Sequence, residues 1–492
     1  MVGDAVQNGK NVLYPATVLH DLPNARFYLT SGAVVRLIER QIDNVLKAES
    51  IGEETLEKAT LDCALDLGRQ LDRLAEGDER KNRLLQHILR RTGRRLPEAA
   101  QWTRERLLGK IERGLDDLEN QTILHTGPHH DDIMLGYMPY VMHLVRRASN
   151  TNNFYILTSG FTAVTNAFLA KLLKDVDGFL DENEFDADRD AGDLDPGKKA
   201  ARAAEVYRFL DGIAARDDRM RRRAQARRML VSLMIVYEDE DFENLKQRIS
   251  ENLNYLKTLY PGKKDVLVIQ RLKGMQREYE EELIWAYVGT NPELVFHGRL
   301  GFYTGDIFTE QPTLGRDVAP VLEMLQKLKP TVVSLAFDPE GSGPDTHYKV
   351  LQVLHEALLE YHRQTGQAPT VWGYRNVWYR FHPAEANIFV PATLNTMAIM
   401  AHSFMNCFGS QRSASFPSYE YDGPFCYHAQ KLWVEQFEAL KTCLGEHFFI
   451  ENPHPRLRAA RGFVFMKSMP LSEFSGKARS LAEATEAISI QK

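Results

Sequence analysis

Residues 121–126 (QTILHT) constrain the fold of this chain more than any other stretch of its sequence. This short apolar run is followed by Gly-Pro, which suits a buried strand. Residues 133–145 then stay apolar over a helical length, and residues 154–157 form a second short apolar run. A strand, a helix and a strand in this order are typical of the βαβ unit of a parallel sheet. The sequence therefore predicts an α/β fold.

The chain divides into stretches of different character. Apolar residues at three- and four-residue spacing predict helices before the sheet region. Within the sheet region, an acidic stretch and an arginine-rich stretch interrupt the pattern of strands. The expected domains are a helical N-terminal region at 1–118, the first part of an α/β domain at 119–172, a helical insertion at 173–264, the remainder of the α/β domain at 265–475 and a tail at 476–492. Further strands are expected at 266–269, 294–297, 331–337, 370–374, 388–390 and 462–466.

Composition argues against several classes of protein. The formal net charge of −6 argues against a nucleic-acid binder. The four cysteines form no CxxC pair, so we expect neither a thiolate zinc site nor a disulfide framework, and we expect a cytoplasmic location. No run of about 18 apolar residues occurs and the N-terminus lacks a signal-peptide pattern, so no membrane partner is expected. We expect any homo-oligomer to form through the helical regions.

Four residues with ligand side chains follow the first predicted strand directly: His129, His130, Asp131 and Asp132. In open α/β sheets, sites form at the carboxyl ends of the strands. A catalytic metal site needs about three protein ligands and an open position for water, and a nearby free carboxylate can take the water's proton. An Asp is also common as a helix N-cap, but capping does not account for two His and two Asp together. The run therefore predicts a divalent metal site.

The same run resembles the first motif, AHPDDExxxG, of the LmbE-like deacetylases, also called the PIG-L family. His129, Asp131 and Asp132 match its His and its two Asp, and His130 takes the place of its Pro. The resemblance implies a Rossmann-like, mostly parallel sheet. It also implies that His129 and Asp132 bind zinc or another divalent metal, with Asp131 as the general base. His130 is then a substrate contact or a spectator.

Later segments resemble the family in the same order. Arg277 and Glu280 match an Arg-x-x-Glu helix, which implies that Arg277 reaches an active-site carboxylate or the substrate; a surface ion pair is the alternative. His347, after Gly-Pro-Asp-Thr, takes the position of the third zinc ligand. This stretch and the loop at 415–425 are most similar to the deacetylase-like domain found fused to glucosamine-6-phosphate deaminase-type proteins.

Three positions depart from the family pattern, and one of them is Ser159, which replaces an Asp. Gly343 stands where the family has a His that steadies the oxyanion or protonates the leaving amine, and Ile133 replaces a Glu. Another acid is therefore expected. His382, in the donor-rich stretch 374–382, is the candidate, although the aromatic residues of this stretch suit a structural role equally well.

The resulting hypothesis is a zinc-dependent N-deacetylase acting on an N-acetylglucosamine-type sugar or sugar phosphate. Asp131 is its base, a metal-bound water is the nucleophile and His382 is the acid. The residues expected to contact the small-molecule amino-sugar substrate are His130, Arg277, Arg375, Arg380 and Arg412, the last three through an anionic group. The alternatives are a catalytically impaired sugar- or nucleotide-sugar-binding member of the same fold, and a helical scaffold protein.

Overall fold

The computed structural model describes residues 6, 10–12, 15–26, 37–181, 194–260, 263–306, 309–338, 345–414, 423–484 and 490–491. Contacts divide the chain into two compact units. Unit 1 consists of Met1–Leu115, Phe381–Pro391 and Glu435–Phe465, and unit 2 consists of Asp116–Arg380, Ala392–Val434 and Met466–Lys492. Gly343 and residues 415–422 of the sequence motifs lie outside the described residues. Within the described ranges, no helix is both long and apolar enough to cross a membrane.

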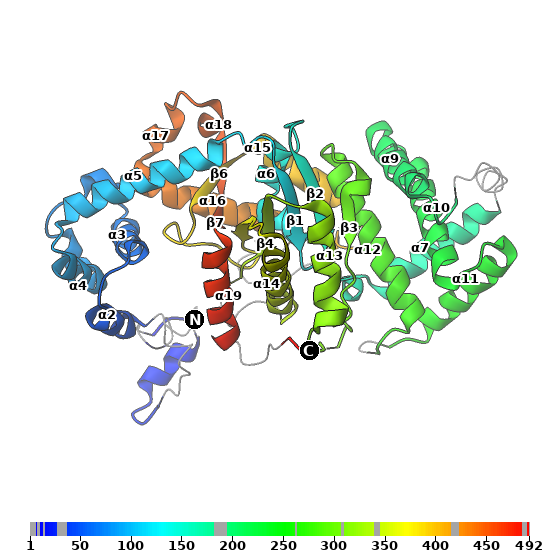
Figure 1. The fold of residues 1–492 in the computed structure, drawn as a ribbon, viewed down its shortest axis with the longest axis horizontal. Helices are drawn as coiled ribbons and strands as arrows, with labels where there is room; N and C mark the ends of the chain where they lie inside the picture. The colour runs from blue at the N-terminus through cyan, green and yellow to red at the C-terminus, as the bar shows by residue number, and fades with distance from the viewer. Residues whose placement is uncertain are drawn as a thin grey trace. The chain divides into compact units, whose positions relative to one another are not determined.

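One mixed sheet, with seven strands among the described residues, forms the framework of the fold (Figure 1). The strands are β1 (Thr122–Gly127), β2 (Thr151–Ile156), β3 (Val295–His297), β4 (Val332–Ala336), β5 (Thr370–Tyr374), β6 (Ile388–Thr393) and β7 (Ala460–Met469). Their order is β3-β2-β1-β4-β5-β7-β6. The pairs from β3 to β5 are parallel, and β7 runs antiparallel to β5. The predicted α/β class is confirmed.

The order of the strands shows where a site can form. The chain moves outward from β1 through β2 to β3, and it then returns to β4 on the other side of β1. In open α/β sheets, ligands bind outside the carboxyl ends of the strands at such a switch point. The loops that follow β1 and β4 therefore lie next to each other at this edge, and both carry polar residues that the sequence singled out.

The helices of unit 2 either cover the faces of the sheet or pack in a separate core. They are α6 (Asp132–Leu144), η4 (Phe161–Ala163), α7 (Asn166–Leu180), α9 (Lys199–Ala215), α10 (Asp218–Tyr237), α11 (Phe242–Lys257), α12 (Leu267–Tyr287), η5 (Pro292–Leu294), η6 (Leu314–Val318), α13 (Ala319–Leu328), α14 (Asp345–Thr365), α15 (Leu394–Cys407) and α19 (Leu471–Ala484). Leu124 and Val333 pack with α13, α14 and α19 on one face, which is turned toward the viewer in Figure 1. On the other face His125 stacks on Phe154, which stacks on Trp285 of α12. This alternation follows from the two-residue period of a strand.

The segment between the two parts of the sheet is helical where it is described. Helices α7, α10 and α11 share an apolar core with the first turns of α12, including Leu230, Ile249, Ile269 and Leu272. The prediction of a strand at 266–269 is wrong, because these residues form the N-cap and first turn of α12. A run of four apolar residues fits a strand or one buried helix face, and here Ile269 packs on a helix face.

Unit 1 is mainly helical. Its elements are η1 (Pro15–Asp21), α2 (Ile38–Lys47), α3 (Glu53–Leu67), η2 (Leu71–Arg73), η3 (Asp78–Lys81), α4 (Arg83–Thr92), α5 (Leu96–Leu115), α17 (Glu446–Ile450) and α18 (Pro455–Arg458), with α16 (Phe425–Leu444) continuing into it from unit 2. Buried Lys110 donates to the Glu57 carboxylate and, at 2.7 Å, to the carbonyl of Pro383. A Cβ at Gly114 would lie 1.8 Å from the carbonyl oxygen of Phe389, so α5 packs directly against the backbone there.

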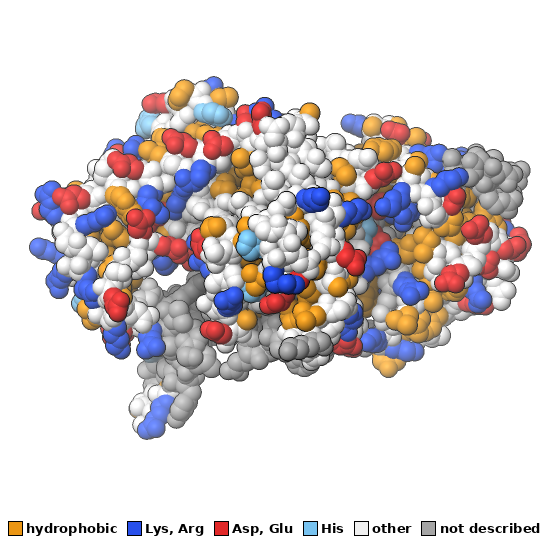
Figure 2. All heavy atoms as spheres, viewed as in Figure 1, with side chains coloured by type: hydrophobic (Ala, Val, Ile, Leu, Met, Phe, Trp, Pro, Cys, Tyr) orange, Lys and Arg blue, Asp and Glu red, His pale blue; other side chains and the backbone are white. Residues whose placement is uncertain are grey.

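These contacts divide the chain differently from the expected domain boundaries. Residues 381–391 and 435–465 belong with the N-terminal helices, although the sequence placed them in the α/β domain. Residues 476–492, expected as a tail, include the second half of α19, where Ala478 is buried in the core. On the face drawn in Figure 2, acidic and basic side chains are interspersed, in keeping with the small net charge.

Candidate metal centre

Three side chains from two segments of the chain meet at the switch point. β1 ends at Gly127, and His129 and Asp132 follow at the start of α6, while His347 lies in the first turn of α14 beyond β4. Gly127 is required by the tight turn, because a Cβ there would lie 2.9 Å from the carbonyl oxygen of His129. Of the described residues, only His129, Asp132 and His347 form a group of metal-ligand type with all their ligand atoms within 4.8 Å of one another.

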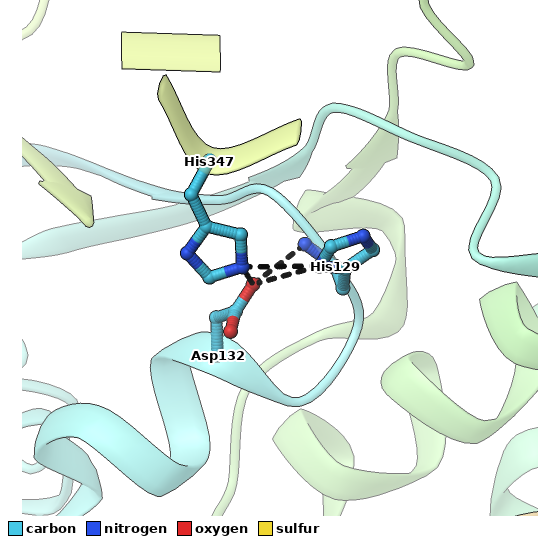
Figure 3. Close-up of side chains that lie close together, drawn as sticks. All are labelled: His129, Asp132 and His347. Carbon is cyan, nitrogen blue, oxygen red and sulfur yellow. Dashed lines mark hydrogen bonds and ion pairs between the residues drawn. The ribbon is translucent and has the colours of Figure 1, made fainter. Parts of the chain in front are cut away.

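The three ligand atoms form a nearly equilateral triangle (Figure 3). His129 Nδ1 lies 3.2 Å from His347 Nε2, and Asp132 Oδ2 lies 3.4 Å from each of these nitrogens. Three ligands held about 2.0–2.1 Å from a tetrahedral zinc ion lie about 3.3–3.4 Å apart. The donor set of two imidazoles and one carboxylate therefore fits a zinc ion in both chemistry and spacing, and a tetrahedral ion would keep its fourth position open.

Asp338 orients His347 from behind. It accepts a hydrogen bond from His347 Nδ1 at 2.7 Å, and it accepts two more from the backbone and side-chain amides of Asn376, at 3.0 and 2.9 Å. With the proton on Nδ1, the Nε2 lone pair of His347 faces the other two ligand atoms. Burial disfavours the imidazolium, but Asp132 and Asp338 outweigh burial and raise the pKa of His347 to about 9. The site therefore attracts positive charge.

Asp132 is held as an anion. Burial opposes ionisation of its carboxyl, but His347 and His129 outweigh it and lower the pKa of Asp132. The backbone N–H of His129 also donates to Asp132 Oδ2 at 2.8 Å. An ionised carboxylate and neutral imidazoles are the forms that bind zinc.

Asp131 lies beside the triangle and is paired with a buried cation. Arg277 Nη2 of α12 is 3.7 Å from Asp131 Oδ2, and the Arg277 side chain is almost fully buried. Glu280 Oε2 and Ser410 Oγ accept hydrogen bonds from Arg277 Nη1 at 3.1 and 3.3 Å, and Ser410 also donates to Glu280. The guanidinium is thus held in a fixed position next to a carboxylate that is not one of the three ligands.

His130 is buried and is not one of the three ligand residues. Its ring stacks on His297 with centroids 5.8 Å apart, and Gly160 lies against it. Both ring nitrogens are buried without a hydrogen-bond partner among the described residues. Burial, followed by repulsion from Arg277, holds the pKa of His130 well below its usual value, so the ring is neutral. A substrate contact by His130 stays a prediction.

The other predicted site residues are not part of the triangle. His382 belongs to unit 1, where its Nε2 lies 3.0 Å from Asp62 Oδ1, and its role as the acid stays a prediction. Arg375 lies over the ring of Phe337, with 5.8 Å between guanidinium carbon and ring centroid, while Arg380 and Arg412 are exposed. Their contacts with an anionic substrate are untested.

Three residues near the centre were not assigned a role from the sequence. Asp338 and Asn376 support His347 as described above, and Asp338 was detectable only as an Asp that follows a strong strand. The ring of Tyr303 meets His129 edge-on at 5.9 Å, and its hydroxyl lies 2.7 Å from Thr162 Oγ1. Burial raises the pKa of Tyr303, so its hydroxyl keeps its proton. Nothing in the sequence around Tyr303 indicated this position.

Comparisons with known proteins add little to this geometry. No family model matches the chain, and no curated protein matches it. Among solved structures, it is similar to a deacetylase triple mutant of the teicoplanin biosynthetic pathway, with 11% sequence identity and a TM-score of 0.27. The match covers 71% of this chain and 98% of the other. At this TM-score the likeness carries no argument about fold or function.

Proposed function

We propose that this chain is a metal-dependent amide hydrolase of the LmbE-like type, which removes an acetyl group from an N-acetylglucosamine-type sugar or sugar phosphate. The triangle formed by His129, Asp132 and His347 carries the proposal, because its edges match those of a zinc site with one open position. A carboxylate outside the triangle, Asp131, stands next to it, as hydrolysis requires. The sugar is inferred from the sequence motifs alone.

The triangle, Asp131 and Arg277 have different roles in the proposed reaction. A zinc ion held by the triangle would polarise the acetamide carbonyl and acidify a water molecule. Asp131 takes a proton from the attacking water, and its ion pair with Arg277 keeps this carboxylate in place. A bond forms from the water oxygen to the carbonyl carbon, and the C–N bond then breaks. The leaving amine needs a proton, which Asp131 can return; His382 stays the alternative donor.

Metal analysis joined to an acetate-release assay tests this proposal. The purified full chain should hold about one zinc ion per molecule and release acetate from at least one member of a panel of N-acetylated amino sugars and their phosphates. His129→Ala should lose both the metal and the activity. His447→Ala, at a histidine whose side chain is 81% exposed, should lose neither. A chain that binds no divalent metal, or whose activity survives His129→Ala, would overturn the assignment.

One observation favours a binding protein without hydrolysis. Ile133 is buried where the family motif has a Glu, so an acidic group is missing directly after the cluster. Stoichiometric zinc with no acetate release from any sugar in the panel, together with saturable sugar binding, would support this second function.

A further inference from the structure

A cavity lies in unit 2, apart from the metal centre. It has a volume of about 230 Å³ and is lined by residues of α9, α12, η5 and β3 and by Arg299 just beyond β3. A single water needs about 15 Å³ on the same measure, so the cavity has room for a small molecule. None of the three metal-ligand residues lines it. Its wall residue His297 ends β3 at the same edge of the sheet and stacks on His130.

The acidic residues of α12 in this cavity are already neutralised. Glu278 accepts two hydrogen bonds from Arg299, through Nε and Nη2. Glu282 accepts two from buried Arg228, each 2.8 Å long, and lies 3.4 Å from His297 Nε2. Arg228, together with His297, holds the pKa of Glu282 at about 2 even though burial opposes its ionisation. These two carboxylates therefore offer no free negative charge to a ligand.

Two cations of the cavity have no such partner. Lys199 and Arg202 lie three residues apart on α9, a spacing that puts them on one face of the helix. In the described part of the chain, neither side chain makes a hydrogen bond or ion pair. Burial, and then repulsion from Arg228, lowers the pKa of Arg202, while Glu282 and Glu278 oppose this shift. Glu293 also lines the cavity but is exposed to solvent.

Two further features favour an anion over a cation. Lys199 is the first residue of α9, a helix of 17 residues, so the positive end of its dipole and its unpaired N–H groups lie at the cavity. His297, whose Nδ1 is buried without a hydrogen-bond partner among the described residues, also lines the cavity. Guanidinium groups bind phosphate through two parallel hydrogen bonds, which a hydrated lysine alone does not offer.

We propose that this cavity binds the phosphoryl group of a small phosphate monoester, with Lys199 and Arg202 as its cationic contacts. The cavity is larger than a phosphoryl group requires, so an organic part of the ligand fits beside it. The proposal concerns binding alone, and it holds whether or not the metal centre hydrolyses an amide.

Calorimetric titration of the full chain tests the proposal, with inorganic phosphate, glucose 6-phosphate and uncharged glucose as probes. Glucose 6-phosphate should bind, glucose should not, and inorganic phosphate should bind more weakly than the ester if the organic part fits the cavity. Arg202→Met and Lys199→Met should each weaken binding of glucose 6-phosphate by about tenfold or more, because each removes one charge-assisted contact. Arg146→Met, at an exposed arginine that does not line the cavity, is the matched control and should bind like the wild type.

His129→Ala separates this cavity from the metal centre, since phosphate can also bind a metal ion. Binding that persists in His129→Ala and weakens in Arg202→Met supports the proposal. Failure of the wild-type chain to bind either phosphate compound, equal binding by the two α9 variants and the wild type, or loss of binding in His129→Ala would overturn it. Lys199 is exposed and has no structural partner among the described residues, so its variant should fold normally.

Discussion

Two buried clusters of charged and polar side chains, one in each unit, show how a structural cluster differs from a binding site. In unit 1, Lys110 and Glu57 are both almost fully buried, and each satisfies the other. Arg106 Nε also donates a hydrogen bond of 2.8 Å to Glu57 Oε2. In unit 2, His129, Asp132 and His347 bring three ligand atoms to within 3.4 Å of one another. The charges of the first cluster are paired within the protein, whereas the ligand atoms of the second are arranged to bind a metal ion.

The strongest test of this contrast is Asp131→Asn. Asp131 lies beside the triangle and is not one of its ligands, so the variant should keep its metal but lose activity by about 10²–10⁴-fold. Acetate release and elemental analysis of the same sample measure the two effects separately. Asp177→Asn, at an exposed position of α7, should change neither. If Asp131→Asn removed the metal as well, Asp131 would belong to the ligand set and would not be the base.

The next test breaks the cluster in unit 1. Lys110→Met leaves the Glu57 carboxylate buried with Arg106 as its remaining partner, so the free energy of unfolding should fall by about 3 kcal/mol. Urea unfolding measures this change, and zinc content should stay the same. Replacing both partners, as Lys110→Met with Glu57→Leu, should restore part of the loss, since no unpaired charge is then buried. A double variant less stable than the single one would show that the pair is not self-contained.

A third test concerns a buried histidine that needs no ion, four residues before His129. His125 lies 2.7 Å from the Tyr137 hydroxyl and 3.1 Å from Asn152 Oδ1, and burial lowers its pKa to about 4. Between pH 6.5 and 4 the unfolded chain therefore binds more protons than the folded protein. This contribution to stability is complete above pH 6.5 and is lost as the pH falls toward 4, by about 3 kcal/mol at most.

Unfolding free energies of the wild type and His125→Gln at pH 7 and pH 4.5 check this sign. The difference between the two pH values should be smaller in the variant, because glutamine does not titrate. An equal pH dependence in both proteins would mean that His125 is charged in the folded state or contributes nothing.

The sequence predicted those parts of the fold that depend on local patterns. β1, α6 and β2 follow one another within 35 residues, so their apolar pattern was enough to indicate a parallel sheet. The run 266–269 was misassigned because four apolar residues fit either a strand or a helix face. Residues 381–391 join unit 1 through contacts with distant residues, such as the close approach of Gly114 to Phe389, and no local sequence pattern predicts such contacts.

The residues of the candidate site also differ in how far the sequence could predict their contacts. His129 and Asp132 stand three residues apart, so their convergence was accessible from the sequence. His347 lies 218 residues beyond His129 and was reached only through the family resemblance. Asp62, the partner of His382, is 320 residues away from it. Such pairs are determined by the packing of distant elements, which a single sequence does not reveal.

The smallest expected effect tests the support behind the triangle. Asp338→Asn keeps the shape of the side chain but weakens the acceptor that holds His347 Nδ1–H, so zinc affinity should fall by about 10- to 100-fold. Competition with a chelator of known affinity measures this change. The matched control is Asp317→Asn, at a buried aspartate that accepts from the backbone N–H groups of Phe302 and Thr313, and it should leave zinc affinity unchanged. Equal affinities in the wild type and Asp338→Asn would mean that the three ligands hold the ion without support. The difference between the cluster of unit 1 and the metal centre of unit 2 would then lie in the three ligands themselves, without a contribution from Asp338.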